Sequence, residues 1–210
     1  MKKIIDKNKI YWSQKEFVNS IIFGFLFLVA SLFINYSAGN FATKKAGNGV
    51  TDIFLDNIPI VNVGQVFIWG AILLFIFIIV VILREPHYLP FILKSLALFY
   101  LVRAIFMTLT HIGPYYEFAS LPPSRIINWT LDSGLFFSGH TGMPFLMALI
   151  FWKFFRLRLA FIVISIIFGI SVLLSHIHYS IDVVAAFFIT YAIFEMAKNL
   201  FPKSFKLISE

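Results

Sequence analysis

Two histidines and an aspartate are the residues of this chain best suited to chemistry. His178 and Asp182 are four positions apart, a spacing that places both side chains on one face if a helix begins there. The carboxylate can then fix the imidazole tautomer and raise its basicity, which makes the free nitrogen a nucleophile toward phosphorus. His140 is a second imidazole, able to protonate a leaving oxygen and then take a proton from an incoming hydroxyl. These residues predict a phosphoryl-type transfer that uses no metal and no other cofactor.

The residues around His140 are typical of a phosphate site. Ser138-Gly139-His140-Thr141 is expected to open a short helix, with Thr141 as its N-cap and Pro144 in its first turn. A helix N-terminus favours an anion, and Gly139 lets the backbone approach a phosphate closely. We therefore expect Ser138, Gly139 and Thr141 to bind the substrate phosphate.

Four further charged residues are candidate ligands for the substrate. Arg103 is expected near the outer end of a helix, where its guanidinium either clamps phosphate oxygens or extends to the lipid headgroups. Asp52 and Asp56 either attract a cationic headgroup or only solvate a loop. Glu117 is a weaker candidate for the same headgroup role.

Two alternatives remain open for the histidine motif. His178 and Asp182 could be no more than a helix-capping pair at the membrane interface. They could also hold a metal together with His176, but two positions along a helix would turn His176 away from His178. We expect no metal.

The composition indicates a protein that lies mostly in lipid. The 210 residues are 60% hydrophobic and 13% charged, with a mean hydropathy of +0.90. The absence of cysteine excludes disulfides and cysteine-based zinc sites. The net charge of +7 comes from residues scattered between apolar runs, so no nucleic-acid partner is expected.

The apolar runs predict an all-α integral membrane protein, a bundle of six transmembrane helices. A span needs about 20 apolar residues, and the fourth run is short by this measure. A cytoplasmic N-terminal arm (1–16) and a cytoplasmic tail (201–210) would flank one membrane domain (17–200), with outer loops at 35–65 and 110–141. The expected spans are 17–34, 66–83, 89–109, 143–155, 159–174 and 181–200.

The distribution of basic residues predicts the orientation. With the N-terminus inside, thirteen of the 17 Lys and Arg, including Lys94, fall in cytoplasmic segments. Both termini would then be cytoplasmic, and His140 and His178 would share the extracytoplasmic side. We expect a multi-pass protein of the plasma membrane. The outer loops keep three basic residues: Lys44, Lys45 and Arg125.

Four short motifs resemble those of the sphingomyelin synthases, which belong to the type 2 phosphatidic acid phosphatase superfamily. The resemblance implies a six-helix bundle with an outward-facing site and a phosphohistidine at His178. It also implies transfer of a phospho-headgroup from a phospholipid to another lipid's hydroxyl, with diacylglycerol or a ceramide-like lipid as acceptor. The matching segments are FFSGHT at 136–141, HYSIDV at 178–183, RAIFM at 103–107 with Thr110 and Pro114, and DIFLD at 52–56.

The chain departs from this pattern at several positions. Gly134, in the run 132–134, replaces an expected aspartate, and Phe187 replaces an expected tyrosine. The Lys-x6-Arg-Pro motif of ordinary lipid phosphatases is missing, which favours a synthase-like transfer over hydrolysis. Hydrolysis, with water as acceptor, stays the second interpretation. A lipid transporter with dispensable histidines is the third.

Overall fold

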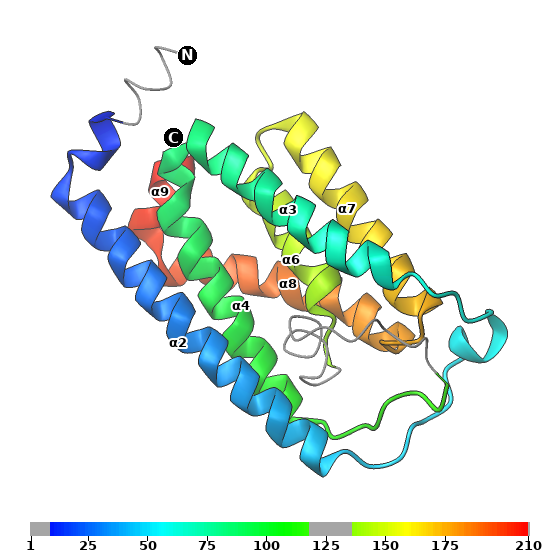
Figure 1. The fold of residues 1–210 in the computed structure, drawn as a ribbon. Coiled ribbons are helices and arrows are strands. Elements are labelled where there is room, and N and C mark those ends of the chain that lie inside the picture. Colours follow the sequence, from blue (N-terminus) through cyan, green and yellow to red (C-terminus); the bar gives the residue numbers. More distant parts are fainter. Residues whose placement is uncertain (1–8, 118–135, 210) are drawn as a thin grey trace.

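The computed structural model describes residues 9–117 and 136–209, and these residues form an all-helical bundle (Figure 1). The start of α2 and the short helix α9 lie at the same end of the bundle. The described helices are α2 (Lys15–Lys45), η1 (Leu55–Asn57), α3 (Gly64–Arg84), η2 (Pro86–Tyr88), α4 (Leu89–Leu109), α6 (Gly139–Ile150), α7 (Phe155–Leu174), α8 (Ser180–Leu200) and α9 (Pro202–Ser209).

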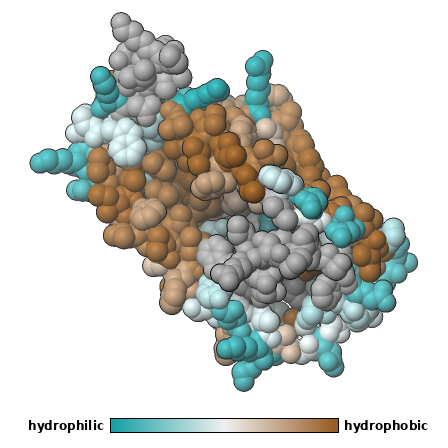
Figure 2. Space-filling model, viewed as in Figure 1, coloured by the Kyte–Doolittle hydropathy of each residue, from teal (hydrophilic) through white to brown (hydrophobic). Residues whose placement is uncertain are grey.

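Five of the described helices are long and apolar enough to cross a membrane: α2, α3, α4 (with η2), α7 and α8. The molecular surface carries an apolar band between two polar ends, as Figure 2 shows for one face. The prediction of an all-α membrane protein is therefore confirmed, but the count of six spans is not. The fourth predicted span corresponds to α6, whose 12 residues reach only about 18 Å, against about 30 Å of hydrocarbon.

α6 is short because it lies inside the bundle rather than against lipid. It packs on α7 and α8, and Leu146, Met147 and Ala148 are completely buried. A helix that is apolar on all sides is typical of such a position. The motif 138–141 at its N-terminus is thereby fixed by the helices around it.

Gly142 sets how closely α6 approaches its neighbours. A Cβ at this position would lie 2.8 Å from the Phe99 ring of α4 and 2.8 Å from Thr190 Oγ1 of α8. We therefore expect Gly142→Ala to lower the free energy of unfolding by about 1–3 kcal/mol, through overpacking. Thermal unfolding in detergent measures this loss.

Gly139→Ala is the matched control for that change, because its Cβ would meet only ordinary contacts. The nearest atom, Arg103 Nε, is 3.5 Å away. Equal melting temperatures for the two variants would contradict the close packing at Gly142.

α2 extends beyond its predicted span. The prediction of 89–109 for the third span is confirmed by α4, whereas α2 continues as helix through 35–45, a stretch assigned to an outer loop. That assignment is wrong because small side chains, Ala38 and Ala42, keep this part of α2 packed against Ala104 and Met107 of α4.

Lys94 joins three helices near the start of α2. The prediction placed it in a cytoplasmic segment, but its side chain is buried within α4. Its Nζ donates to Ser20 Oγ of α2 and to Ser204 Oγ of α9, each at 2.7 Å. The segment predicted as a tail at 201–210 therefore contains a docked helix, α9.

Candidate active site

His178 and Asp182 meet at the junction of α7 and α8. Tyr179 is the N-cap of α8, so His178 precedes the helix and Asp182 is its third residue. Asp182 Oδ2 lies 3.2 Å from His178 Nδ1 and accepts a hydrogen bond of 3.0 Å from the Tyr179 N–H. The contact predicted from a shared helical face therefore exists, but it forms because Asp182 reaches back over the helix start, as in a capping box. Both side chains are buried.

This contact favours one tautomer of His178. A carboxylate beside Nδ1 favours the tautomer in which Nδ1–H donates, which leaves the lone pair on Nε2. Within residues 9–117 and 136–209, Nε2 has no hydrogen-bond partner of its own. The arrangement is that of a nucleophile held by an orienting acid.

Ser138 connects the two histidine motifs, 138–141 and 178–183. It is the N-cap of α6, so the prediction of Thr141 as N-cap is wrong: Ser138 Oγ accepts from Thr141 N at 3.4 Å and lies 3.2 Å from Thr141 Oγ1. Pro144 is accordingly inside the helix, beyond its first turn. The Ser138 N–H donates to the carbonyl oxygen of Asp182 at 3.1 Å. This bond fixes the start of α6 against the start of α8.

Arg103 lies inside the bundle beside the start of α6. Its Nε donates to the carbonyl of Phe137 at 2.9 Å, and its Nη1 donates to Asn35 Oδ1 at 3.3 Å. The side chain is 6% exposed, which excludes extension toward headgroups at the surface. Arg103 Nε is the atom nearest to the position that a Cβ on Gly139 would take. The guanidinium therefore faces the start of α6, where we expect the phosphate to bind.

Asn35 is a partner of Arg103 that the sequence interpretation missed. It is buried in α2 and accepts the hydrogen bond from Arg103 Nη1. The sequence feature that could have revealed it is a polar amide at the end of an otherwise apolar run, where an amide without a hydrogen-bond partner would be costly.

His140 completes the group. It lies in the first turn of α6, half-buried, with its ring centroid 6.0 Å from that of Phe168. His140 lies within electrostatic range of both His178 and Arg103. His140 and Arg103 thus lie at the N-terminus of α6, where the positive end of the helix dipole favours an anion.

Asp52 and Asp56, predicted as headgroup ligands, both stabilise the loop between α2 and α3. Asp52 Oδ2 accepts from Ser180 N at 2.7 Å, at the first residue of α8. Asp56 Oδ1 accepts from the Tyr115 hydroxyl at 2.6 Å, and this bond raises the pKa of Tyr115 above its ordinary value. Glu117 is exposed. A headgroup role for the three carboxylates stays a prediction.

The loops after α2 and α4 pair with each other beside the catalytic motif. Gly47 N donates to the His111 carbonyl at 2.9 Å, and Gly113 N donates to the Asn48 carbonyl at 3.3 Å. The Tyr179 hydroxyl donates to the Gly113 carbonyl at 2.9 Å. A Cβ at Gly113 would lie 2.2 Å from the Gly47 oxygen, so the approach requires glycine. The residue next to His178 is thus anchored from outside the bundle.

The pKa of Asp52 links this loop to stability. Burial acts to raise that pKa, but hydrogen bonds from Ser180, Phe54 and Leu55 outweigh it and hold the pKa below its ordinary value of 3.8. The ionised carboxylate therefore stabilises the fold above about pH 4, and this contribution is lost as the pH falls through the folded-state pKa.

We expect Asp52→Asn to lower the melting temperature at neutral pH, with a smaller difference from wild type below about pH 4. Thermal unfolding of both proteins across this range measures the difference. Glu117→Gln, which removes an exposed carboxylate, controls for the loss of one negative charge. A difference that stays constant from neutral to acid pH would contradict the role of the ionised Asp52.

His176 has an unusual conformation at the end of α7. Its N–H donates to the Leu173 carbonyl and that of Ile177 to the Val172 carbonyl, the two bonds of a Schellman motif. His176 takes the left-handed position of this motif, with φ 54°, where glycine is preferred. Its buried ring packs on Tyr115 with both nitrogens unpaired among the described residues.

The metal interpretation gains no support from this arrangement. Among the described residues, no group of three or more His, Asp or Glu side chains is arranged to hold a metal ion.

Two other predictions, the outer-loop Arg125 and the variant motif at 132–134, lie outside the described residues.

The comparisons with known proteins agree with the motifs. No curated protein and no solved structure matches the chain. Residues 133–200 match the protein family described as PAP2 superfamily C-terminal, a range that includes His140, His178 and Asp182. This match supports the type 2 phosphatidic acid phosphatase superfamily, whose members are phosphatases or phosphotransferases that act on lipids.

Proposed function

We propose that the protein is a sphingomyelin-synthase-like lipid phosphotransferase, which moves a phospho-headgroup from a phospholipid to a lipid hydroxyl. The observation that carries the proposal is the hydrogen-bonded pair of His178 and Asp182, joined through Ser138 to the N-terminus of α6. A nucleophile, its orienting acid and an anion-binding helix start thus share one site. The family match of residues 133–200 supports chemistry on a lipid phosphate.

In the first half of the reaction, the Nε2 lone pair of His178 attacks the phosphorus of the donor. The bond from phosphorus to the diacylglycerol oxygen breaks, and His140 gives that oxygen its proton. Asp182 stabilises the positive charge that develops on His178. Arg103 and the N–H groups of the first turn of α6 bind the phosphate oxygens.

In the second half, a lipid hydroxyl replaces diacylglycerol. Its proton passes to His140, its oxygen attacks the phosphohistidine, and the bond from phosphorus to Nε2 breaks. One histidine therefore serves as acid and then as base, so the enzyme returns to its starting protonation state after each cycle.

Two alternatives make different predictions. If water replaces the lipid acceptor, the protein is a lipid phosphatase or a phospholipase C-like hydrolase, and the site residues keep the same roles. If the protein is a non-catalytic lipid transporter, His178→Ala would leave its lipid-handling activity intact.

Product analysis distinguishes the three functions. Purified protein in bilayers would receive a mixture of phospholipid donors with fluorescent ceramide and fluorescent diacylglycerol, and the lipids would be separated by chromatography. We expect a new fluorescent lipid that carries a headgroup and is absent with His178→Ala. Release of water-soluble phosphate or phosphoalcohol instead would favour the hydrolase. The absence of both kinds of product would contradict an enzyme of this class.

The proposed chemistry uses two imidazoles, so chelators should leave the rate unchanged. We expect equal turnover before and after treatment with EDTA. A complete loss that a divalent cation restores would overturn the proposed mechanism.

A further inference from the structure

A cavity of about 590 Å³ opens at the end of the bundle where α2 begins. It lies between the last turns of α3 and the segment that leads from α6 into α7. Most of its wall is apolar, and its charged residues come from the helix ends. The lining residues are Phe77, Val80, Val81, Phe154, Phe155 and Leu157, with Arg84, Glu85, Lys153 and Arg156 among them.

The charged residues of this cavity give it a net positive charge. Three of them are cations, and the single carboxylate, Glu85, lies 3.6 Å from Nδ1 of His87. In the part of the chain that the structure describes, neither Arg84 nor Arg156 has a carboxylate within ion-pair distance. Two guanidinium groups therefore remain available to an external anion, and their forked donors fit phosphate oxygens.

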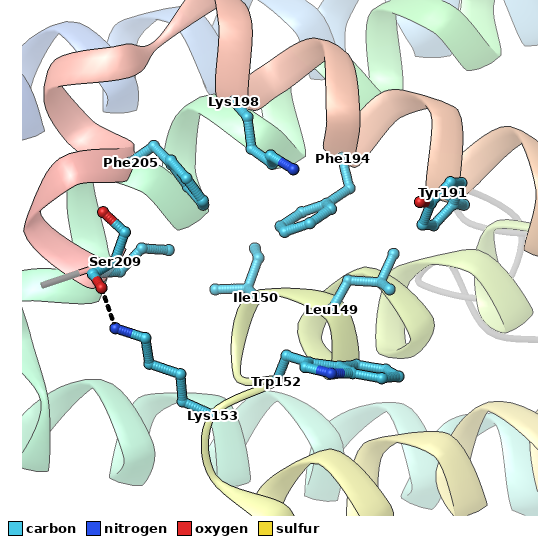
Figure 3. Close-up of a pocket in the computed structure, with 10 residues that line it drawn as sticks. Leu149, Ile150, Trp152, Lys153, Tyr191, Phe194, Lys198, Phe205 and Ser209 are labelled. Carbon is cyan, nitrogen blue, oxygen red and sulfur yellow. Dashed lines mark hydrogen bonds between the residues drawn. The ribbon is translucent and has the colours of Figure 1, made fainter.

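A second cavity, of about 390 Å³, serves as a comparison (Figure 3). It lies between α6, α8 and α9 and shares Lys153 with the first. Its other cation, Lys198, is 2.7 Å from Glu195, and Lys153 donates to the carbonyl of Ser209. The protein itself neutralises Lys198, so the cavity with unpaired arginines is the better site for an anion.

We propose that the cavity between α3 and α7 binds one anionic phospholipid from the adjacent leaflet. Its phosphate lies between Arg84 and Arg156, and an acyl chain lies along Phe77 and Val81. Basic pockets between membrane helices recognise such headgroups, and an apolar wall beside them accepts the hydrocarbon. The site is at the opposite end of the bundle from His178, so binding does not depend on the proposed reaction.

Native mass spectrometry of the full-length protein tests this site. The protein in detergent micelles would be titrated with phosphatidylglycerol and, separately, with phosphatidylcholine. We expect one phosphatidylglycerol to be retained at concentrations where phosphatidylcholine is not. Equal retention of the two lipids would overturn the proposal.

Paired variants locate the site. Arg84→Gln with Arg156→Gln should weaken phosphatidylglycerol binding about tenfold or more. Lys15→Gln with Lys203→Gln removes the same charge at the same end, outside the cavity, and should have a much smaller effect. Equal losses in the two pairs would show only non-specific attraction and would overturn the proposal.

Two further proteins separate folding and catalysis from binding. Arg84→Lys with Arg156→Lys keeps the charges, so a folded protein with intermediate affinity is expected because the forked donors are lost. Unchanged affinity in this pair would overturn the arginine clamp. His178→Ala should retain phosphatidylglycerol like wild type, so failure of the lipid site and failure of the proposed reaction give different results.

Discussion

His178→Ala is expected to lower turnover by about three orders of magnitude or more, because it removes the proposed nucleophile rather than a packing contact. It should also abolish the covalent intermediate. Donor phospholipid labelled in its phosphate, mixed with wild type and quenched rapidly, should leave an acid-labile and base-stable label on the protein, as a phosphohistidine does. The same experiment with His178→Ala should leave none.

His111→Ala is the matched control for this variant. His111 is an exposed histidine of the loop after α4, and its side chain contacts Phe41 rather than the site. We expect wild-type turnover and labelling from it. Turnover close to normal in His178→Ala, with an unchanged melting temperature, would defeat the histidine mechanism and favour the transporter.

Asp182→Asn is expected to lower turnover by about a hundredfold to ten-thousandfold, as when an aspartate that orients a catalytic histidine is replaced. The amide oxygen can still accept the Tyr179 N–H, so the start of α8 stays capped. The same oxygen faces His178 Nδ1, but the neutral amide no longer stabilises the positive charge that develops on His178 during the attack. Activity should therefore fall while the melting temperature changes little.

Asp182→Ala separates capping from catalysis. It removes the cap as well as the charge, so it should lose activity and also about 1 kcal/mol of unfolding free energy relative to Asp182→Asn. Turnover and thermal unfolding of both variants check this order. If Asp182→Asn kept the wild-type rate, Asp182 would be only a helix cap, the alternative that the sequence left open.

The extent to which the site was predictable differs between residues. His178 and Asp182 were paired correctly from their spacing, since an acidic residue in the first turn of a helix that begins near 180 can reach back to the residues just before it. Thr141 was misassigned because Ser138, three positions earlier, is an equally good N-cap and only the direction of the chain at α6 decides between them. The orientation of Arg103 was open because its acceptors are 34 and 68 positions away along the chain.

The helix boundaries also divide into those that the sequence predicted and those that it did not. α3, α4 and α8 match their predicted spans within two residues because hydropathy and proline mark their ends. α2 runs past its predicted end at 34 because its last three turns are held by contact with α4. The hydropathy of one segment cannot predict such a contact between two helices. α6 did not provide the sixth span, since its burial by α7 and α8 depends on the whole bundle.

The sequence by itself determined the membrane class, the identity of the two histidines and the aspartate, and the pairing of His178 with Asp182. These follow from composition and from spacings of a few residues, which act through local geometry. The tertiary structure decided what surrounds them: the bond from Ser138 N to the Asp182 carbonyl, the support of Arg103 by Asn35, and the anchoring of Ser180 by Asp52. Such contacts join residues 44 to 128 positions apart, and they form only when the helices pack, because packing alone buries polar groups that must then find partners.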